Sequence, residues 1–300
     1  MSALSLPASR SHVYAGILLT SISYFMFTVH DAAVKLLVAA IPVWQVLFFR
    51  SITILIGCVV FGGRDVYAEA FRSPIIKSMF LRSFLILGAW LCYYTAARDL
   101  QLAELTTIYY AAPVIVTVLS VVLLKEQVPL PRWAAVLIGF VGVYLACNPA
   151  TLGFSAPVLL VLLAAFLWGL AIVLLRKIAL REKTIIQMIL NNIFFLVTAG
   201  LPLFYLWQTP SWNETLLLFG AGIIAGLAQF TLFEGMKRAE ASVVAPFEYT
   251  SLIWAFLLGY LIWADVPRRE VFVGAALIMG AGFLIIAGEH FRRRDLPLKK

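Results

Sequence analysis

Residues 102–124, LAELTTIYYAAPVIVTVLSVVLL, form a continuous apolar run that is long enough to cross a lipid bilayer as one helix. About 30 Å of hydrocarbon needs roughly 20 helical residues at 1.5 Å each. Nine further runs of the same character accompany it. The ten candidate spans are 13–37, 42–62, 76–97, 102–124, 131–148, 156–176, 184–207, 214–236, 241–263 and 270–288. The sequence therefore predicts an all-α membrane protein with ten transmembrane helices.

The composition excludes a water-soluble enzyme core and a membrane β-barrel. Of the 300 residues, 63% are apolar and 13% are charged, a balance that no soluble domain of this size needs. A barrel would show stretches of about ten residues with alternating polarity, whereas these runs are continuously apolar. The first run is too long for a signal peptide and leads straight into the second span, so we expect it to stay in the mature protein.

The second half of the chain repeats the layout of the first half about 140 residues later. A shift of 142 residues places Lys35 on Lys177, and a shift of 138 places Gly88 on Gly226. Because each half holds five spans, the two halves have opposite orientations, an arrangement that builds a pocket near the middle of the bilayer. We expect inverted five-helix repeats at 12–148 and 156–288, followed by a basic cytoplasmic tail at 289–300.

The positive charges indicate the orientation. The segments on the side of the N-terminus hold 17 Lys and Arg residues, and the opposite loops hold 3. By the positive-inside rule, both termini are cytoplasmic in a multi-pass protein of a bacterial-type inner membrane. The net charge of +8 then indicates contact with anionic lipid, and we expect no nucleic acid partner. The three cysteines lack metal-ligand spacing, so we expect no metal and no cofactor.

One passage and its looser recurrence resemble a known family. They are Ile108-Tyr-Tyr-Ala-Ala-Pro113 with Lys125-Glu126 and Gly139 to Gly142, then Ser251 onward, Asp265 and Gly280 to Gly282. Over about 12–288 the chain resembles the EamA type of the drug/metabolite transporter superfamily, with YddG-like amino acid exporters as the nearest branch. The resemblance implies a ten-helix monomer in which spans 1, 3, 4, 6, 8 and 9 line a central cavity. Members carry amino acids, vitamins, cofactors and toxic cations, so the resemblance is weak for the substrate.

Charged residues inside the spans are costly and therefore face a cavity or a partner. Arg50 and Asp31 lie at matching depths on the first two spans, which allows an ion pair between them. In the alternative interpretation, Lys35 neutralises Asp31 from one helical turn away, and Arg50 is free to hold a substrate carboxylate. The two arrangements could also be successive states of one transport cycle.

Further polar residues are candidates for coupling or gating. His30 titrates near neutral pH when unperturbed and is a candidate for proton coupling, although a lone histidine in a span is more often a packing residue. Arg82 and Glu248 lie at matching depths and suit a structural or gating bridge. Asn191 is a candidate for contact with substrate, although polar residues of this kind within spans more often form hydrogen bonds between helices.

Deep aromatic residues are candidates for ligand contact. Trp90 and Tyr94 share one helix face at i,i+4, and Trp168 lies on the helix related to the first span by the repeat. Tyr110 is also deep within a span. Such rings stack on flat ligands or attract an amine through cation–π contact, although packing alone also explains them.

The sequence thus predicts a secondary transporter that moves a small amphipathic metabolite by alternating access. Our first expectation is an aromatic or neutral amino acid exporter, and the alternative is a carrier of riboflavin-like or S-adenosylmethionine-like compounds. No GxxxxGK[ST] segment for nucleotide binding is present. An intramembrane enzyme is disfavoured because HExxH and GxSxG are absent. The expected partners are a small-molecule substrate and the lipid bilayer.

Overall fold

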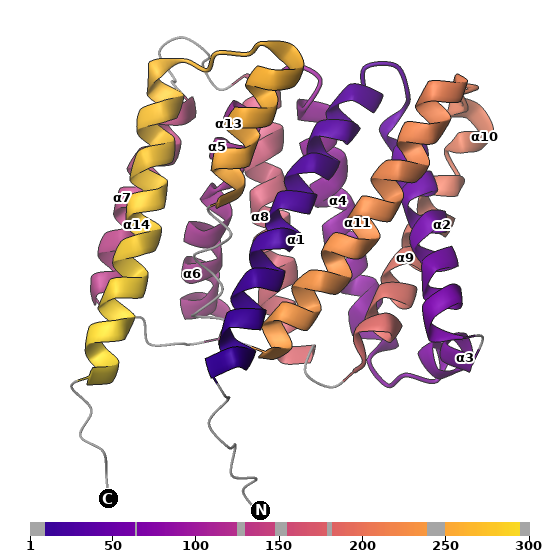
Figure 1. The fold of residues 1–300 in the computed structure, drawn as a ribbon, viewed down its shortest axis with the longest axis horizontal. Helices are drawn as coiled ribbons and strands as arrows, with labels where there is room; N and C mark the ends of the chain where they lie inside the picture. Colours follow the sequence, from indigo (N-terminus) through magenta and orange to yellow (C-terminus); the bar gives the residue numbers. More distant parts are fainter. Residues whose placement is uncertain are drawn as a thin grey trace, which may run out of the picture.

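The computed structural model describes residues 10–63, 65–124, 130–147, 155–178, 182–238 and 250–294, and these residues form helices without any strand (Figure 1). The first half contains α1 (Arg10–Leu37), α2 (Val43–Gly62), α3 (Asp65–Phe71), α4 (Ile76–Ala96), α5 (Leu102–Tyr109), α6 (Ala111–Leu124) and α7 (Leu130–Cys147). The second half contains α8 (Ala156–Ile178), α9 (Thr184–Gly200), α10 (Leu203–Leu206), α11 (Trp212–Arg238), α13 (Thr250–Trp263) and α14 (Arg269–Arg294).

The helices have the length and character of membrane spans. Among the described residues, five stretches are long and apolar enough to cross a bilayer: Tyr14–Leu37, Val43–Gly62, Ile76–Ala96, Leu102–Leu123 and Trp212–Gly235. Four shorter apolar helices accompany them, at Leu137–Ala146, Ala156–Ala171, Thr184–Gly200 and Thr250–Trp263. The all-α membrane fold is therefore confirmed, and the number of ten crossings stays a prediction.

The helix contacts are nearly unchanged when the two halves are exchanged. The expected repeat pairs α1 with α8, α2 with α9, α4 with α11, and α7 with α14. In the structure α2 packs on α9 and α7 on α14, while α1 packs on α11 just as α8 packs on α4. Likewise α2 contacts α11 as α9 contacts α4, and α1 contacts α13 as α8 contacts α6. Two halves related by an approximate twofold axis are expected to show this pattern of contacts. The borders proposed for the repeats and for the basic tail stay predictions.

The α1 helix begins and the α14 helix ends at the same end of the bundle, the lower end in Figure 1. We call this the inner end, following the predicted orientation, and the opposite end the outer end. At the inner end, the Lys183 ammonium lies 2.7 Å from a Glu69 carboxylate oxygen. At the outer end, Arg268 Nη2 lies 3.0 Å from Glu104 Oε1. Each of these ion pairs joins the first half of the chain to the second.

The fourth predicted span is interrupted where α5 ends at Tyr109 and α6 begins at Ala111. Pro113 has no backbone N–H, so the carbonyl of Tyr109, four residues earlier, loses its usual helical donor. The Tyr110 hydroxyl forms a hydrogen bond with Ser251 near the start of α13. The break thus carries a polar contact between the halves in the interior of the bundle.

Small residues bring α11 close to α2. A Cβ atom added to Gly222 would lie 2.7 Å from Thr53 Cβ, and one added to Gly226 would lie 3.2 Å from an Ile54 side-chain carbon. These glycines therefore act as packing elements.

Candidate functional site

The Arg50 side chain is buried in the bundle beside an aromatic ring. It extends from α2, is 3% exposed, and its guanidinium carbon lies 3.7 Å from the centre of the Trp90 ring on α4. Its Nε and Nη1 atoms are buried without a hydrogen-bond partner. Arg50 forms no ion pair with any residue that the structure describes.

A buried guanidinium without an anion is energetically expensive. Even after relaxation, the penalty for desolvating a single ion is several kcal/mol. The Trp90 ring offsets only part of this penalty, because a cation–π contact contributes about 0.5–2 kcal/mol. The arrangement is therefore suited to a ligand that brings a carboxylate or another anion to Arg50.

A carboxylate and an imidazole from α1, those of Asp31 and His30, lie near the Arg50 guanidinium. His30 Nδ1 is 3.3 Å from Asp31 Oδ1, and the His30 ring meets the Tyr94 ring edge-on at 6.1 Å between centres. His30 is buried and its Nε2 has no hydrogen-bond partner, whereas the Asp31 side chain keeps 27% of its surface accessible. Asp31 interacts electrostatically with both Arg50 and Tyr94, so an anion and a cation lie near one another without being bonded.

Neither predicted neutralisation of Asp31 occurs in this structure. Asp31 and Arg50 are not within ion-pair distance, and Lys35 forms no ion pair with Asp31. Lys35 Nζ instead donates to the carbonyl of Ala97 at 2.8 Å and to the carbonyl of Leu100. The last carbonyls of a helix have no intrahelical donor, so the end of α4 competes successfully for this ammonium. Lys35 therefore joins α1 to the end of α4 rather than serving the Asp31 site.

The aromatic residues divide into two groups. Tyr94 and Trp90 belong to the Arg50–Asp31 site, where Trp90 also packs on Phe195 at 4.8 Å between centres. Tyr93 joins them, since its ring lies 5.6 Å from that of Tyr94 and 5.1 Å from that of Tyr109. Tyr93 is recognisable from the sequence as a further deep aromatic residue, three positions from Trp90. Phe195 comes from α9, and no local sequence pattern links it to Trp90.

The remaining candidates lie elsewhere. Trp168 is half-buried in α8 and packs against the main apolar core. The Oδ1 atom of Asn191 accepts a hydrogen bond from the Ser83 hydroxyl at 2.9 Å, which accounts for this residue as a bridge between α9 and α4. Tyr110 is held by Ser251. Arg82 is buried in α4, and Glu248, its predicted partner, lies outside the described residues.

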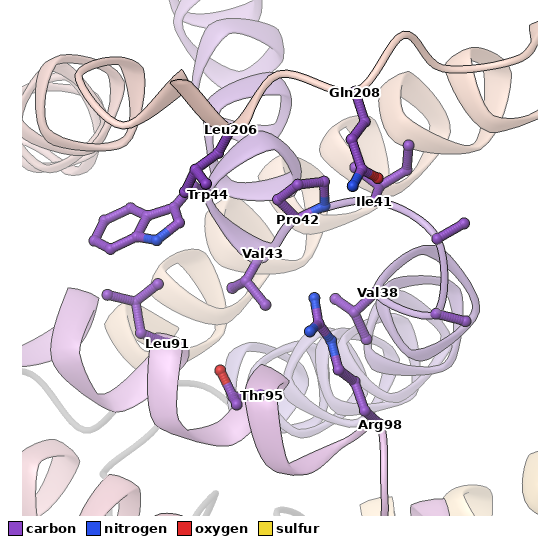
Figure 2. Close-up of a pocket in the computed structure, with 12 residues that line it drawn as sticks. Val38, Ile41, Pro42, Val43, Trp44, Leu91, Thr95, Arg98, Leu206 and Gln208 are labelled. Atoms are coloured by element: carbon purple, nitrogen blue, oxygen red, sulfur yellow. The ribbon is translucent and has the colours of Figure 1, made fainter. Parts of the chain in front are cut away.

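A cavity of about 790 Å³ opens at the outer end, between the α1–α2 connection, α4 and the segment around α10. Figure 2 shows Arg98, just after the end of α4, extending into this space, with Gln208 across from it. Arg50, Asp31 and Trp90 are not among its lining residues. The lining residues Leu91 and Thr95 are on α4 beside Trp90 and Tyr94, and Arg98 follows the outer end of that helix, so the cavity lies on the outer side of the buried site.

Among the described residues, no cluster of three His, Cys, Asp or Glu side chains could hold a metal ion. The expectation that the protein needs no metal or cofactor stays a prediction.

Three kinds of curated relatives resemble the chain over much of its length. It is 26% identical over 280 residues to an S-adenosylmethionine uptake transporter of Rickettsia conorii, covering 90% of this chain and 94% of that protein. It is 30% identical over 204 residues to a riboflavin transporter of Vibrio cholerae, covering 66% and 67%. It is 24% identical over 275 residues to a pseudopaline exporter of Pseudomonas aeruginosa, covering 89% and 94%.

A solved crystal structure has the same fold with a TM-score of 0.65 and 20% identity, covering 95% of this chain and 99% of the other. The model of the EamA-like transporter family matches residues 14–147 and again residues 155–287, one match in each half. The apolar helices, the exchange of helix contacts between the halves, and both matches agree. The chain therefore belongs to the EamA-like transporter family and is a multi-pass membrane transporter rather than an enzyme.

Proposed function

We propose that this protein carries a small zwitterionic metabolite with an α-amino-acid head group and a flat ring, and that S-adenosylmethionine or a compound like it is the substrate. Transport occurs by alternating access around a site between α1, α2 and α4. Arg50 binds the carboxylate, Asp31 faces the positive group, and Trp90, Tyr93 and Tyr94 contact the ring.

The unpaired guanidinium of Arg50 carries the proposal. Its Nε and Nη1 atoms need acceptors that the described residues do not provide. A carboxylate can accept two parallel hydrogen bonds from a guanidinium, which compensates the buried charge better than a single neutral acceptor. The stacking of Arg50 on Trp90 holds the guanidinium in place before the ligand arrives.

The presence of Asp31 near Arg50 favours a zwitterionic substrate over a simple anion. Its side chain is partly accessible, it lies close enough to Arg50 for electrostatic interaction, and it has no ion pair with Lys35. A ligand with a positive group beside its carboxylate can therefore satisfy Asp31 and Arg50 together. Both an α-amino acid and S-adenosylmethionine have this head group.

The choice of S-adenosylmethionine over a plain amino acid rests on the relatives named as its uptake transporters, which cover about nine-tenths of this chain. An aromatic amino acid is the second candidate, because the same three rings could hold its side chain. Riboflavin, the named substrate of other relatives, has no carboxylate and would leave Arg50 uncompensated.

The test is uptake by proteoliposomes of radiolabelled S-adenosylmethionine, phenylalanine and riboflavin in parallel. We expect saturable S-adenosylmethionine transport with counterflow. We also expect Arg50→Gln and Asp31→Asn to raise the half-saturation concentration, with Arg50→Lys intermediate. Arg72→Gln, at an exposed arginine beside α3, is the matched control and should behave like the wild type. Transport of riboflavin alone, or unchanged affinity in Arg50→Gln, would contradict the proposal.

A further inference from the structure

A second arginine, Arg82, is buried in α4 nearer the inner end. It is 5% exposed and lies in the second turn of the helix. Eleven residues separate it from Tyr93, which is three helical turns and about 16 Å along the axis. The two side chains therefore leave α4 in nearly the same direction, and the helix face that carries Tyr93 at the Asp31 site continues inward to Arg82.

Arg82 has no compensating partner among the described residues. Its Nε atom is buried without a hydrogen-bond acceptor, and none of the described ion pairs includes it. The neighbouring Ser83 is satisfied by Asn191 on α9. The contact between α4 and α9 is thus made without the donors of Arg82.

A purely structural role does not explain such a residue. Replacing a buried ion by an apolar side chain of similar volume is often neutral or stabilising, so an unpaired buried arginine adds nothing to the packing of α4. Within a transporter, charged groups inside the spans mark the path of the substrate. The guanidinium of Arg82 therefore suits an anion that is present for only part of the cycle.

We propose that Arg82 is a second binding residue for the substrate carboxylate, occupied when the substrate is on the inner side of the Arg50 site. This inference rests on the proposed function in requiring a substrate that carries a carboxylate. Trp90, on which Arg50 stacks, lies eight residues from Arg82, or about 12 Å along α4. One carboxylate does not span that distance, so it occupies Arg50 and Arg82 in turn.

The test compares right-side-out and inside-out membrane vesicles that contain the full chain, with labelled S-adenosylmethionine as the probe. Protease access to a tag placed after Lys300 identifies the face at which α14 ends. At that face we expect Arg82→Gln to raise the half-saturation concentration at least tenfold, with less than a twofold change at the other face. Arg50→Gln should raise it at both faces, and Arg72→Gln at neither.

Two further measurements exclude a structural explanation. If Arg82 only stabilises the fold, Arg82→Gln lowers the unfolding temperature of the purified protein, whereas an uncompensated charge predicts an equal or higher temperature. If Arg82 acts only through Glu248, Glu248→Gln reproduces the loss in Arg82→Gln, and the two substitutions together add nothing. Either of these results would overturn the proposal, as would an equal effect of Arg82→Gln at both faces or no effect at all.

A binding measurement separates this inference from the proposed function. Acetate, a carboxylate without a ring or an amine, should raise the unfolding temperature of the wild type, and Arg82→Gln should reduce that rise. If the wild type does not carry S-adenosylmethionine, the proposed function fails. The acetate measurement then decides by itself whether Arg82 binds an anion. An acetate effect that is identical in the wild type and in Arg82→Gln would exclude Arg82 as an anion-binding residue.

Discussion

The guanidinium carbon of Arg50 lies 3.7 Å from the centre of the Trp90 ring, so a buried cation on α2 rests against an aromatic side chain on α4. The ring supplies a partial negative charge and excludes water from one side of the guanidinium. The donors at Nε and Nη1 are left without acceptors. This contact thus fixes the position of the arginine while its hydrogen-bonding capacity is kept for a ligand.

The first prediction concerns this contact. Trp90→Leu removes the cation–π attraction, worth about 0.5–2 kcal/mol, so we expect the half-saturation concentration for substrate to rise by roughly 2- to 30-fold. Trp90→Phe keeps an aromatic ring and should raise the half-saturation concentration less than Trp90→Leu does. Transport kinetics in proteoliposomes measure both effects. Trp212→Leu, at a tryptophan that is 75% exposed, is the control and should leave the affinity unchanged. Equal losses at Trp90 and Trp212 would argue against the contact.

The second prediction concerns Lys35. Its ammonium donates to the carbonyls of Ala97, at the end of α4, and of Leu100, in the connection that follows, and Lys35→Met leaves these acceptors without that donor. The loss of a charge-assisted hydrogen bond costs about 1.5–3 kcal/mol, so we expect a lower unfolding temperature in detergent. Lys35→Arg should recover part of the loss.

Substrate affinity distinguishes this role from the one expected from the i,i+4 spacing. If Lys35 neutralised Asp31, Lys35→Met would alter the half-saturation concentration strongly. With the observed hydrogen bonds, the protein that remains folded should bind substrate with nearly the wild-type affinity. A large change in affinity without a change in unfolding temperature would support the interpretation that Lys35 neutralises Asp31.

The hydrogen bonds of Lys35 could not be predicted from the sequence. The i,i+4 spacing correctly places Asp31 and Lys35 on neighbouring turns of α1, but it contains no information about α4. The carbonyls that capture Lys35 lie 62 and 65 residues later in the chain, and only the packing of α1 near the end of α4 brings them together. The helical class and the relation between the halves depend instead on apolar run lengths and spacing, which are directly visible in the sequence.

Part of the Arg50 site could also be predicted from the sequence. A charge inside an apolar run is costly wherever the run packs, so Arg50 and Asp31 were identifiable without a structure. The contact of Arg50 with Trp90 could not be predicted from the sequence, because it joins α2 to α4. Asn191 shows the limit of residue type alone, since its polarity suits a ligand but its side chain is engaged by Ser83.

The third prediction concerns His30, whose role in proton coupling is still a proposal. Its Nδ1 faces Asp31, its Nε2 has no partner, and Arg50 and Tyr94 are the other ionisable groups around it. His30→Gln keeps a side chain that can form hydrogen bonds but does not titrate. We expect it to transport in exchange mode and to lose its response to an imposed pH gradient. A pH profile identical to that of the wild type would remove His30 from the coupling mechanism.

The fourth prediction compares two glycines of α11. A Cβ atom at Gly222 would lie 2.7 Å from Thr53 Cβ, and Thr53 is held in place because its hydroxyl donates to the Phe49 carbonyl at 2.7 Å. Gly222→Ala therefore forces α11 away from α2, and overpacking of this kind costs about 1–3 kcal/mol. Nothing lies within 4 Å of a Cβ atom at Gly220. Gly220→Ala should be neutral or slightly stabilising, because alanine favours a helix over glycine by up to about 1 kcal/mol.

Thermal unfolding of the two purified variants in the same detergent tests this difference. The double substitution Gly222→Ala with Thr53→Gly removes the opposing Cβ atom, so it should be more stable than the sum of the two single losses. Because α2 carries Arg50, separation of α2 from α11 in Gly222→Ala should also disturb Arg50 relative to Trp90 and raise the half-saturation concentration. Equal unfolding temperatures for Gly222→Ala and Gly220→Ala would show that α11 and α2 are not in close contact at Thr53.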